Sequence, residues 1–436
     1  MMFNKISTRF LKDVYLGLCF VMLFNAFNVL TSVQKTITAS IEKDNPSVHL
    51  DGYISLGIVY TTLSLGTWLA PGIIAKTGPK YAMIIGTVFY LIYIASFYTE
   101  LSFWIYLGAA LCGFGASVLW TGQANYTVLN SKIGKAYSSI GVFWILFQSS
   151  HFFGNLIIYF QFNDIDQAID RPLRVRIVLT LVGFVVVAII MMFGIRPPLR
   201  NDEEEKTVRS PGDEIIKSSK LLTTPKMLLL VITMVHLGIH LTFLSILSAS
   251  MSFSRYLSAN SKELAPLCGI FQGIGEILGG FLSIFVGGKK FFKLKPLITI
   301  AFFSNFLCYI IAFLMLPNNA ARSYTDDLPI LLLPNWLLIF GAMLSALGEA
   351  CLQTEAFDHL GVVYPNDSAS AYAVMKFINS VTTAISFYYG EYFGLYTQLL
   401  ILVVFNFLSW ISYHYLQWKY IQPESANNQL EMNQKK

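Results

Sequence analysis

Three charged side chains stand inside long apolar runs in the second half of this sequence: Glu276, Glu349 and Lys376. A charge at the centre of a bilayer costs about 2.5–3.5 kcal/mol on insertion scales, so such a group needs a partner or a cavity. At a rise of about 1.5 Å per residue, each lies roughly 10–15 Å from the cytoplasmic end of its predicted helix. A lysine between two carboxylates at one level predicts either an ion cluster joining three helices or a proton or cation site.

Two histidines, His236 and His240, lie four residues apart and therefore share one face of a helix. Imidazole titrates near neutral pH, so a pair facing a central cavity could couple solute movement to protons. The other interpretation is that both histidines pack inside the protein, and His151, which stands alone, is expected to be structural. Because the sequence offers neither a full set of metal ligands nor a nucleophile with its base, we expect no metal, no cofactor and no enzymatic activity.

Uncharged polar side chains interrupt the apolar runs at Asn25 and Asn28 in the first run, and at Gln123 and Asn125 in the fourth. Asn25 and Asn28 are three residues apart and share a helix face. Hydrogen bonds between helices and contacts with a solute in a cavity both explain such residues. The four amides therefore join the two glutamates, the lysine and the two histidines as candidate cavity or coupling residues.

The elements that must position these residues are predicted to be transmembrane helices. Hydrophobic residues make up 55% of the 436 and charged residues only 13%, whereas a soluble domain carries about 25% charged residues. Lipid is therefore the expected solvent, and the basic residues lie in short loops rather than in one patch that could bind nucleic acid. A spanning helix needs about 20 apolar residues. Such runs predict twelve helices, at 13–34, 53–75, 80–98, 102–128, 137–161, 175–195, 226–252, 264–287, 295–316, 331–357, 369–390 and 396–418.

The longest polar stretch inside the chain separates the twelve runs into two groups of six. We predict an N-terminal half at 1–195, a flexible cytoplasmic linker at 196–224, a C-terminal half at 225–422 and a disordered cytoplasmic tail at 423–436. Two related segments support two related halves. They read Gly115-Ala-Ser-Val-Leu-Trp-Thr121 in the fourth predicted helix and Gly348-Glu-Ala-Cys-Leu-Gln-Thr354 in the tenth.

The distribution of basic residues predicts the orientation in the membrane. Of the 30 Lys and Arg residues, 21 lie in segments on the same side as both termini and eight lie on the other side. Cytoplasmic loops carry the excess of positive charge, so both termini are expected in the cytoplasm. Nothing in the sequence distinguishes a plasma membrane from an endolysosomal membrane.

The pairs Gly269/Gly273 and Gly275/Gly279 predict close packing of the helix at 264–287 against its neighbours.

Four segments give the chain a resemblance to a known family. It resembles the major facilitator superfamily and, within it, the Unc-ninety-three-like (ion channel regulatory protein) family, nearest to the branch of the major facilitator superfamily domain-containing protein eleven. The resemblance implies an all-α membrane fold of 12 transmembrane helices in two six-helix halves. The segments that carry it are Gly113–Gln123, Gly141–Ser150 with Phe152–Asn155, Gly273–Gly280 and Tyr364–Phe377.

One loop departs from the superfamily pattern Gly-x-Leu-Ala-Asp-Arg-x-Gly-Arg-Lys. It reads Pro71-Gly-Ile-Ile-Ala-Lys-Thr-Gly-Pro-Lys80, with Ala75 in the place of the Asp that joins a conformational charge network. The resemblance implies two functions: transport of a small solute or ion, and regulation or trafficking of a partner such as a potassium channel or a receptor. A polar central cavity with two accessible states would favour the first function, and the missing Asp suits the second.

Overall fold

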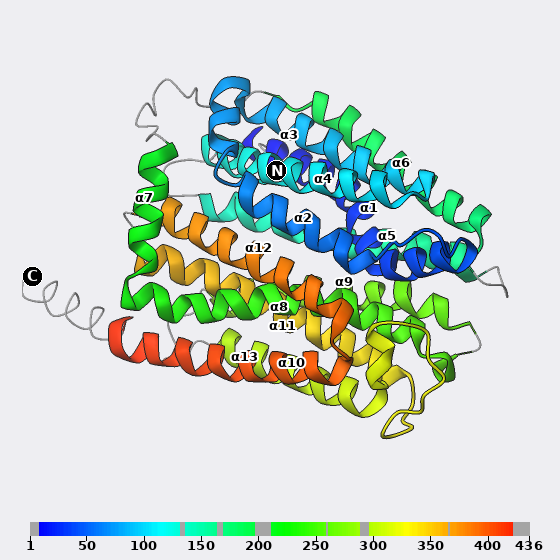
Figure 1. The fold of residues 1–436 in the computed structure, drawn as a ribbon. Helices are drawn as coiled ribbons and strands as arrows, with labels where there is room; N and C mark the ends of the chain where they lie inside the picture. The colour runs from blue at the N-terminus through cyan, green and yellow to red at the C-terminus, as the bar shows by residue number, and fades with distance from the viewer. Residues whose placement is uncertain are drawn as a thin grey trace, which may run out of the picture.

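The computed structural model describes residues 8–130, 136–163, 169–196, 211–258, 260–287, 296–364 and 367–421. The described part is almost entirely helical and contains an isolated β-bridge between Ser254 and Thr325 but no β-strand. Figure 1 shows two groups of long helices side by side, α1–α6 above α8–α13, with α7 across their ends. The first group comprises α1 (Thr8–Asp44), α2 (Gly52–Gly66), α3 (Ala70–Ser96), α4 (Ser102–Asn130), α5 (Ala136–Asn163) and α6 (Arg171–Phe193). After α7 (Pro211–Leu222) come α8 (Pro225–Phe253), α9 (Leu264–Gly287), α10 (Pro296–Met315), α11 (Trp336–Val363), α12 (Ser368–Tyr392) and α13 (Leu395–Leu416).

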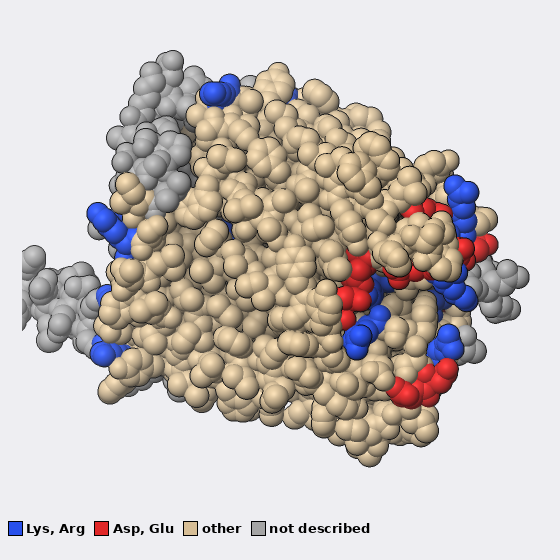
Figure 2. All heavy atoms as spheres, in the orientation of Figure 1, with Lys and Arg blue, Asp and Glu red and all other residues tan. Residues whose placement is uncertain are grey.

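Nine of the described helices are long and apolar enough to cross a membrane: α1, α3, α4, α6, α8, α9, α10, α11 and α13. The face of the molecule in Figure 2 carries a broad band without Lys, Arg, Asp or Glu between two charged ends. Such a band is the surface that hydrocarbon covers. The structure thus confirms an all-α membrane protein. The count of twelve spanning helices stays a prediction, because α2 has only 15 residues, and neither α5 nor α12 is among the nine.

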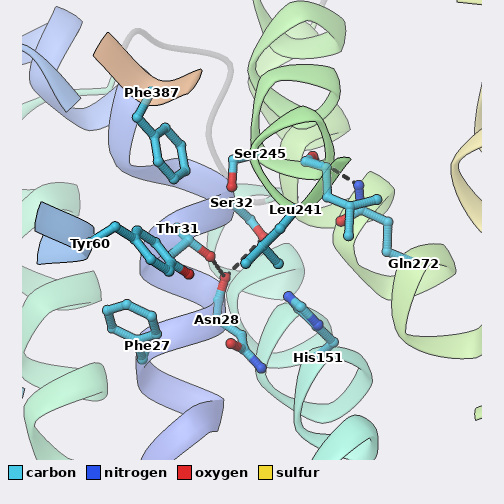
Figure 3. A pocket seen from close by; sticks show the side chains of 11 residues that line it. Phe27, Asn28, Thr31, Ser32, Tyr60, His151, Leu241, Ser245, Gln272 and Phe387 are labelled. Carbon is cyan, nitrogen blue, oxygen red and sulfur yellow. Dashed lines mark hydrogen bonds between the residues drawn. The ribbon is translucent and has the colours of Figure 1, made fainter. Parts of the chain in front are cut away.

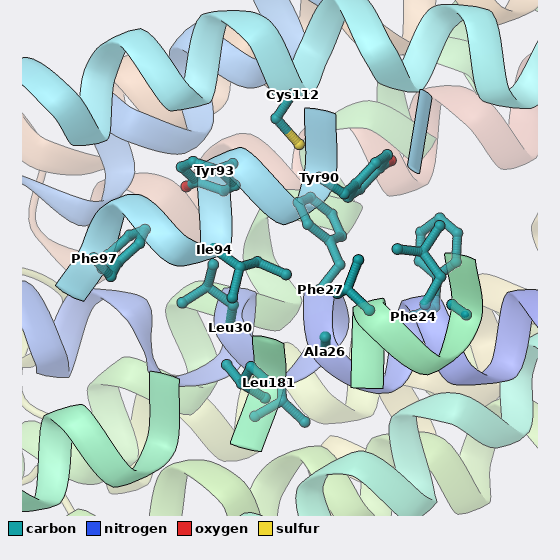
Figure 4. Packing of buried hydrophobic residues seen from close by; sticks show 14 of the residues in the cluster. Phe24, Ala26, Phe27, Leu30, Tyr90, Tyr93, Ile94, Phe97, Cys112 and Leu181 are labelled. Atoms are coloured by element: carbon teal, nitrogen blue, oxygen red, sulfur yellow. The ribbon is translucent and has the colours of Figure 1, made fainter. Parts of the chain in front are cut away.

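Each group of helices packs around its own apolar core. The largest core is built almost wholly by α1–α6, where the rings of Phe24, Phe27 and Tyr90 pack edge to face (Figure 4). The other large cores belong mainly to α8–α13. The repeated segments occupy equivalent places, since Gly115 lies against Gly86 of α3 and Gly348 lies against Asn305 of α10. The two halves therefore repeat one packing arrangement.

Two sequence predictions need correction. The run predicted as one helix at 53–75 is broken, because α2 ends at Gly66 and α3 begins at Ala70. The chain then turns sharply at Gly78, whose φ of 75° favours glycine. The linker is not flexible throughout either, because Pro211–Leu222 form α7, which packs against the start of α12. Residues 197–210 of the linker and the tail at 423–436 lie outside the described residues.

Candidate functional site

A small cavity lies on the axis between the two halves (Figure 3). Its volume is about 40 Å³, which is room for a few water molecules rather than for a solute. The N-terminal half contributes residues of α1, α2 and α5, and the C-terminal half contributes residues of α8, α9 and α12. The wall carries Phe27, Asn28, Thr31, Ser32, Tyr60, His151, Leu241, Leu244, Ser245, Gln272 and Phe387.

A contact between a histidine and a carboxylate crosses the interface beside this cavity. The Nδ1 atom of His151 on α5 lies 2.9 Å from Oε1 and 3.0 Å from Oε2 of Glu276 on α9. Both side chains are largely buried, with 14% and 4% of their surface exposed. The carboxylate of Glu276 therefore has its partner in the other half of the molecule, and that partner is the histidine expected to be structural.

Glycines bring the two helices of this pair into contact. A Cβ atom added at Gly273 of α9 would lie 2.4 Å from the backbone nitrogen of Phe152 on α5, and one at Gly269 would meet the Asn155 side chain at the same distance. The second glycine pair packs elsewhere, because a Cβ at Gly275 would lie 2.1 Å from the carbonyl oxygen of Met343 on α11. The predicted close packing of this helix is thus confirmed on two of its faces.

The structure does not join Glu276, Glu349 and Lys376 into the predicted cluster. Glu349 on α11 is 6% exposed and makes no hydrogen bond or ion pair within the described residues. The charges of Glu276 and Lys376 do act on it. The ammonium of Lys376 on α12 instead lies 5.4 Å from the ring centre of Trp120. Within the described residues these three side chains make no direct contact with one another, and Glu276 pairs instead across the interface with a residue 125 positions away.

His236 and His240 lie inside the C-terminal half rather than on the wall of the cavity. His240 is fully buried, and its Nδ1 lies 2.6 Å from the hydroxyl of Tyr309 on α10. Its Nε2 lies 3.2 Å from the backbone and hydroxyl oxygens of Ser345 on α11. The Nε2 of His236 lies 3.4 Å from the same tyrosine hydroxyl. This arrangement favours the interpretation of two packing histidines that tie α8 to α10 and α11.

Of the four candidate amides, only Asn28 lines the cavity, and its Nδ2 donates to the hydroxyl of Ser150 on α5 at 2.9 Å. Gln123 donates to Thr127 within its own helix. The side-chain oxygens of Asn25 and Asn125 are buried without a hydrogen bond within the described part of the chain. Tyr60 and Gln272 also line the cavity. Sequence reasoning had no means of finding them, because neither residue is charged or belongs to a motif.

A second ion cluster joins the halves at the end of the bundle away from α7. The ammonium of Lys35 on α1 contacts the carboxylates of Asp51, before α2, and Glu391, on α12. Asp51 also caps α2 by accepting from the backbone nitrogens of Tyr53 and Ile54. Burial raises the pKa of Asp51, but its interactions with Glu391 and Lys35 outweigh this and hold the pKa below its usual value. The cluster lines a vestibule of about 630 Å³.

The vestibule end is thus closed by contacts between the halves. The Tyr53 hydroxyl donates to the carbonyl oxygen of Ala321 at 2.9 Å, and Thr61 shares a 3.0 Å hydrogen bond with Tyr388 of α12. Figure 2 shows the acidic and basic side chains gathered at this end.

Residues 44–414 match the family described as "Ion channel regulatory protein UNC-93". The chain belongs to the UNC-93 family. It is 32% identical over 434 residues to UNC93-like protein MFSD11 of Xenopus tropicalis, covering 94% of this chain and 97% of that protein. It is 22% identical over 449 residues to UNC93-like protein 3 of Arabidopsis thaliana, covering 96% and 89%. The resemblance stated from the sequence motifs is therefore confirmed.

Solved structures show which fold the UNC-93 chain adopts. It is similar to the D-xylose-proton symporter, with a TM-score of 0.65 at 13% identity, covering 94% of this chain and 97% of that one. It is also similar to the nucleoside transporter NupG, with a TM-score of 0.61 at 13% identity, covering 94% and 99%. The chain is a multi-pass membrane protein with the major facilitator fold.

The loop that departs from the superfamily pattern supplies no charge between the halves. Ala75 stands at the Asp position and is exposed. Lys80 donates from Nζ to the carbonyl oxygen of Phe193 at 2.7 Å, which satisfies the end of α6 within the same half. Among the described residues of this UNC-93 chain, the contacts of acidic with basic side chains between the halves lie at the vestibule end and at the centre.

Proposed function

We propose that this UNC-93 protein is a proton-coupled transporter of a small solute that works by alternating access. The observation that carries the proposal is the pair of His151 and Glu276, which crosses the interface at the wall of the central cavity. A histidine paired with a carboxylate at such a place can take up or lose a proton as the two halves move. The D-xylose-proton symporter shares the fold, which is compatible with this use of it.

The pair links protonation to the contact between α5 and α9. When His151 is charged and Glu276 is ionised, the two hold the helices together by charge-assisted hydrogen bonds. A proton delivered to Glu276 removes the carboxylate charge and weakens that attraction. Contacts such as those of Lys35 with Glu391 and of Thr61 with Tyr388 would then hold the vestibule end closed or release it.

The test is uptake into proteoliposomes that contain the purified chain, from a panel of small solutes, with and without an inward proton gradient. Glu276→Gln and His151→Gln should remove the dependence on the gradient. The matched control is Glu355→Gln, because Glu355 and His359 are a buried carboxylate–histidine pair on α11, with a Nδ1 to Oε1 distance of 3.7 Å, and Glu355 also accepts from Tyr413 of α13 in the same half. Gradient-dependent uptake that survives in both interface variants would refute the coupling role of this pair.

A second function is supported by the family description and by the loop with Ala75. We infer from them an alternative to transport, in which this protein is a non-transporting regulatory or trafficking partner of an ion channel or receptor. The central cavity of about 40 Å³ is compatible with this alternative, because it has no room for a solute. A folded protein that takes up no solute, and that co-purifies with a channel or receptor in a fixed ratio, would establish this alternative.

The proposed cytoplasmic location of both termini is tested by protease protection of tags at each end.

A further inference from the structure

The ammonium of Lys376 contacts two aromatic rings and forms no direct ion pair with any residue that the structure describes. Its Nζ lies 5.4 Å from the ring centre of Trp120 and 5.7 Å from that of Phe357. Within the described residues, no carboxylate lies within 4.0 Å of it. Contact with rings contributes about 0.5–2 kcal/mol, less than the several kcal/mol that it costs to remove an ammonium from water. Neither the rings nor a directly paired carboxylate therefore neutralises the ammonium, and a bound anion would do so.

The rings around this ammonium form flat apolar walls from both halves of the molecule. Trp120 of α4 stacks on Trp144 of α5, with ring centres 5.9 Å apart and an angle of 16°. Trp144 in turn lies 6.2 Å from Phe357 of α11. A ligand between the halves at this point would meet one positive charge from α12 and aromatic faces from three other helices.

The neighbouring charge limits the kind of anion that fits. Glu349 is buried close enough to Lys376 for their charges to interact, yet it does not pair with the ammonium. A dianion would be repelled by this carboxylate more strongly than a monoanion. One ammonium beside one carboxylate thus favours a ligand with a single negative charge.

The side chains of this site are not fully buried. The side chains of Lys376, Trp120 and Trp144 are only partly buried, although Lys376 lies eight residues into α12, about 12 Å from its start. Ala124, one turn beyond Trp120 on the same face of α4, is exposed. Tyr126 of α4 donates to the carbonyl oxygen of Arg196, just before the linker, so this part of α4 lies at the α7 end. The site therefore lies toward the α7 end, away from the vestibule.

We propose that Lys376 binds the carboxylate of the transported solute, while the rings of Trp120, Trp144 and Phe357 contact its apolar body. The solute class is a monocarboxylate with an aromatic or similarly flat apolar group. This inference rests on the proposed transport function, because it identifies the substrate class of the same central path. It adds a binding site near the α7 end to the coupling pair at the centre.

The test is equilibrium binding of radiolabelled probes to the full chain in nanodiscs, without any proton gradient. Benzoate and indole-3-acetate are compared with their neutral amides, benzamide and indole-3-acetamide, which keep the shape and lose the charge. Each acid should bind at least tenfold more tightly than its amide. Lys376→Gln should reduce that preference to less than twofold, Lys376→Arg should retain it, and Glu349→Gln should strengthen acid binding several-fold by removing a repelling charge.

Thermal unfolding and size-exclusion profiles of the variants show that they are folded before their binding is compared. The absence of a preference for the acid in both probe pairs, or a preference that persists in Lys376→Gln, would overturn the proposal. The outcome for transport is separate. Acid binding that depends on Lys376 in a chain without gradient-driven uptake would leave this site standing and refute the proposed transport function.

Discussion

Replacing Gly273 by Ala tests how closely α5 and α9 must approach for the coupling pair to form. The added Cβ would lie 2.4 Å from the backbone nitrogen of Phe152, whereas ordinary contact begins at 3.4 Å, so the helices must separate by about 1.0 Å at this point. The same movement would lengthen the 2.9 Å contact between His151 and Glu276 to about 3.9 Å, beyond hydrogen-bond range. Overpacking of this kind costs about 1–3 kcal/mol.

The assay combines thermal unfolding in nanodiscs with gradient-driven uptake. For a half of this size, each kcal/mol lowers Tm by about 2–4 °C, so Gly273→Ala should unfold about 2–12 °C below the unmodified chain. It should also lose proton coupling. Gly275→Ala should be destabilised to a similar degree but keep proton coupling, because its Cβ would meet Met343 within the C-terminal half.

Gly183→Ala provides the matched control on α6, where a Cβ would meet nothing within 4 Å. Alanine is the better helix former, so this variant should be unchanged or slightly more stable. The reasoning fails if Gly273→Ala unfolds at the temperature of the unmodified chain. It fails equally if Gly273→Ala and Gly275→Ala lose proton coupling to the same extent, because the interface would then have no special role.

Three further predictions concern the vestibule end and the buried histidines. Because the folded pKa of Asp51 is depressed, its charge stabilises the fold above about pH 4, the ordinary Asp pKa, and this contribution is lost as the pH falls through the folded value. The Tm gap between the unmodified chain and Asp51→Asn should therefore be smaller well below pH 4 than at pH 5, and a gap that widens over this range on acidification would contradict the assignment. Lys35→Met should expose the vestibule side of the central path to a membrane-impermeant thiol reagent at Ser32→Cys, whereas the same reagent should not reach this cysteine when Lys35 is present. His240→Phe should cost about 1–3 kcal/mol by leaving the hydroxyl of Tyr309 without its closest partner, measured as a lower Tm, and should leave the proton dependence of uptake unchanged.

The sequence was sufficient for the class of fold because membrane solvent imposes a simple requirement. Long apolar runs must be helical in lipid. Small residues within them mark places of close helix packing, as Gly273 and Gly275 show on two faces of α9. Helix α7 carried its own signals, with Pro211 at its first turn, Asp213 near its start and Lys220 in its last turn. These were outweighed by the polar composition of the segment as a whole.

The site was only partly predictable because it depends on contacts between distant parts of the chain. Polarity within an apolar run drew attention to Glu276 and Lys376, but it could not reveal that the first contacts His151 and the second contacts aromatic rings. Helical periodicity put His236 and His240 on one face, yet it did not say whether that face meets a cavity or a neighbouring helix. In the structure that neighbour is Tyr309.

The energetics of Lys376 bear on the choice between a transporter and a static regulator. A buried charge without a partner is unfavourable, and replacing such a charge by an apolar side chain of similar volume is often stabilising. Lys376→Met should therefore raise Tm while abolishing the preference for acids, which is the compromise between stability and activity expected at a binding site. A protein whose halves never separated and bound nothing between them would have no use for this ammonium. If Lys376→Met instead lowers Tm by several degrees, the lysine contributes to the fold, and the argument for a ligand at this place loses its energetic basis.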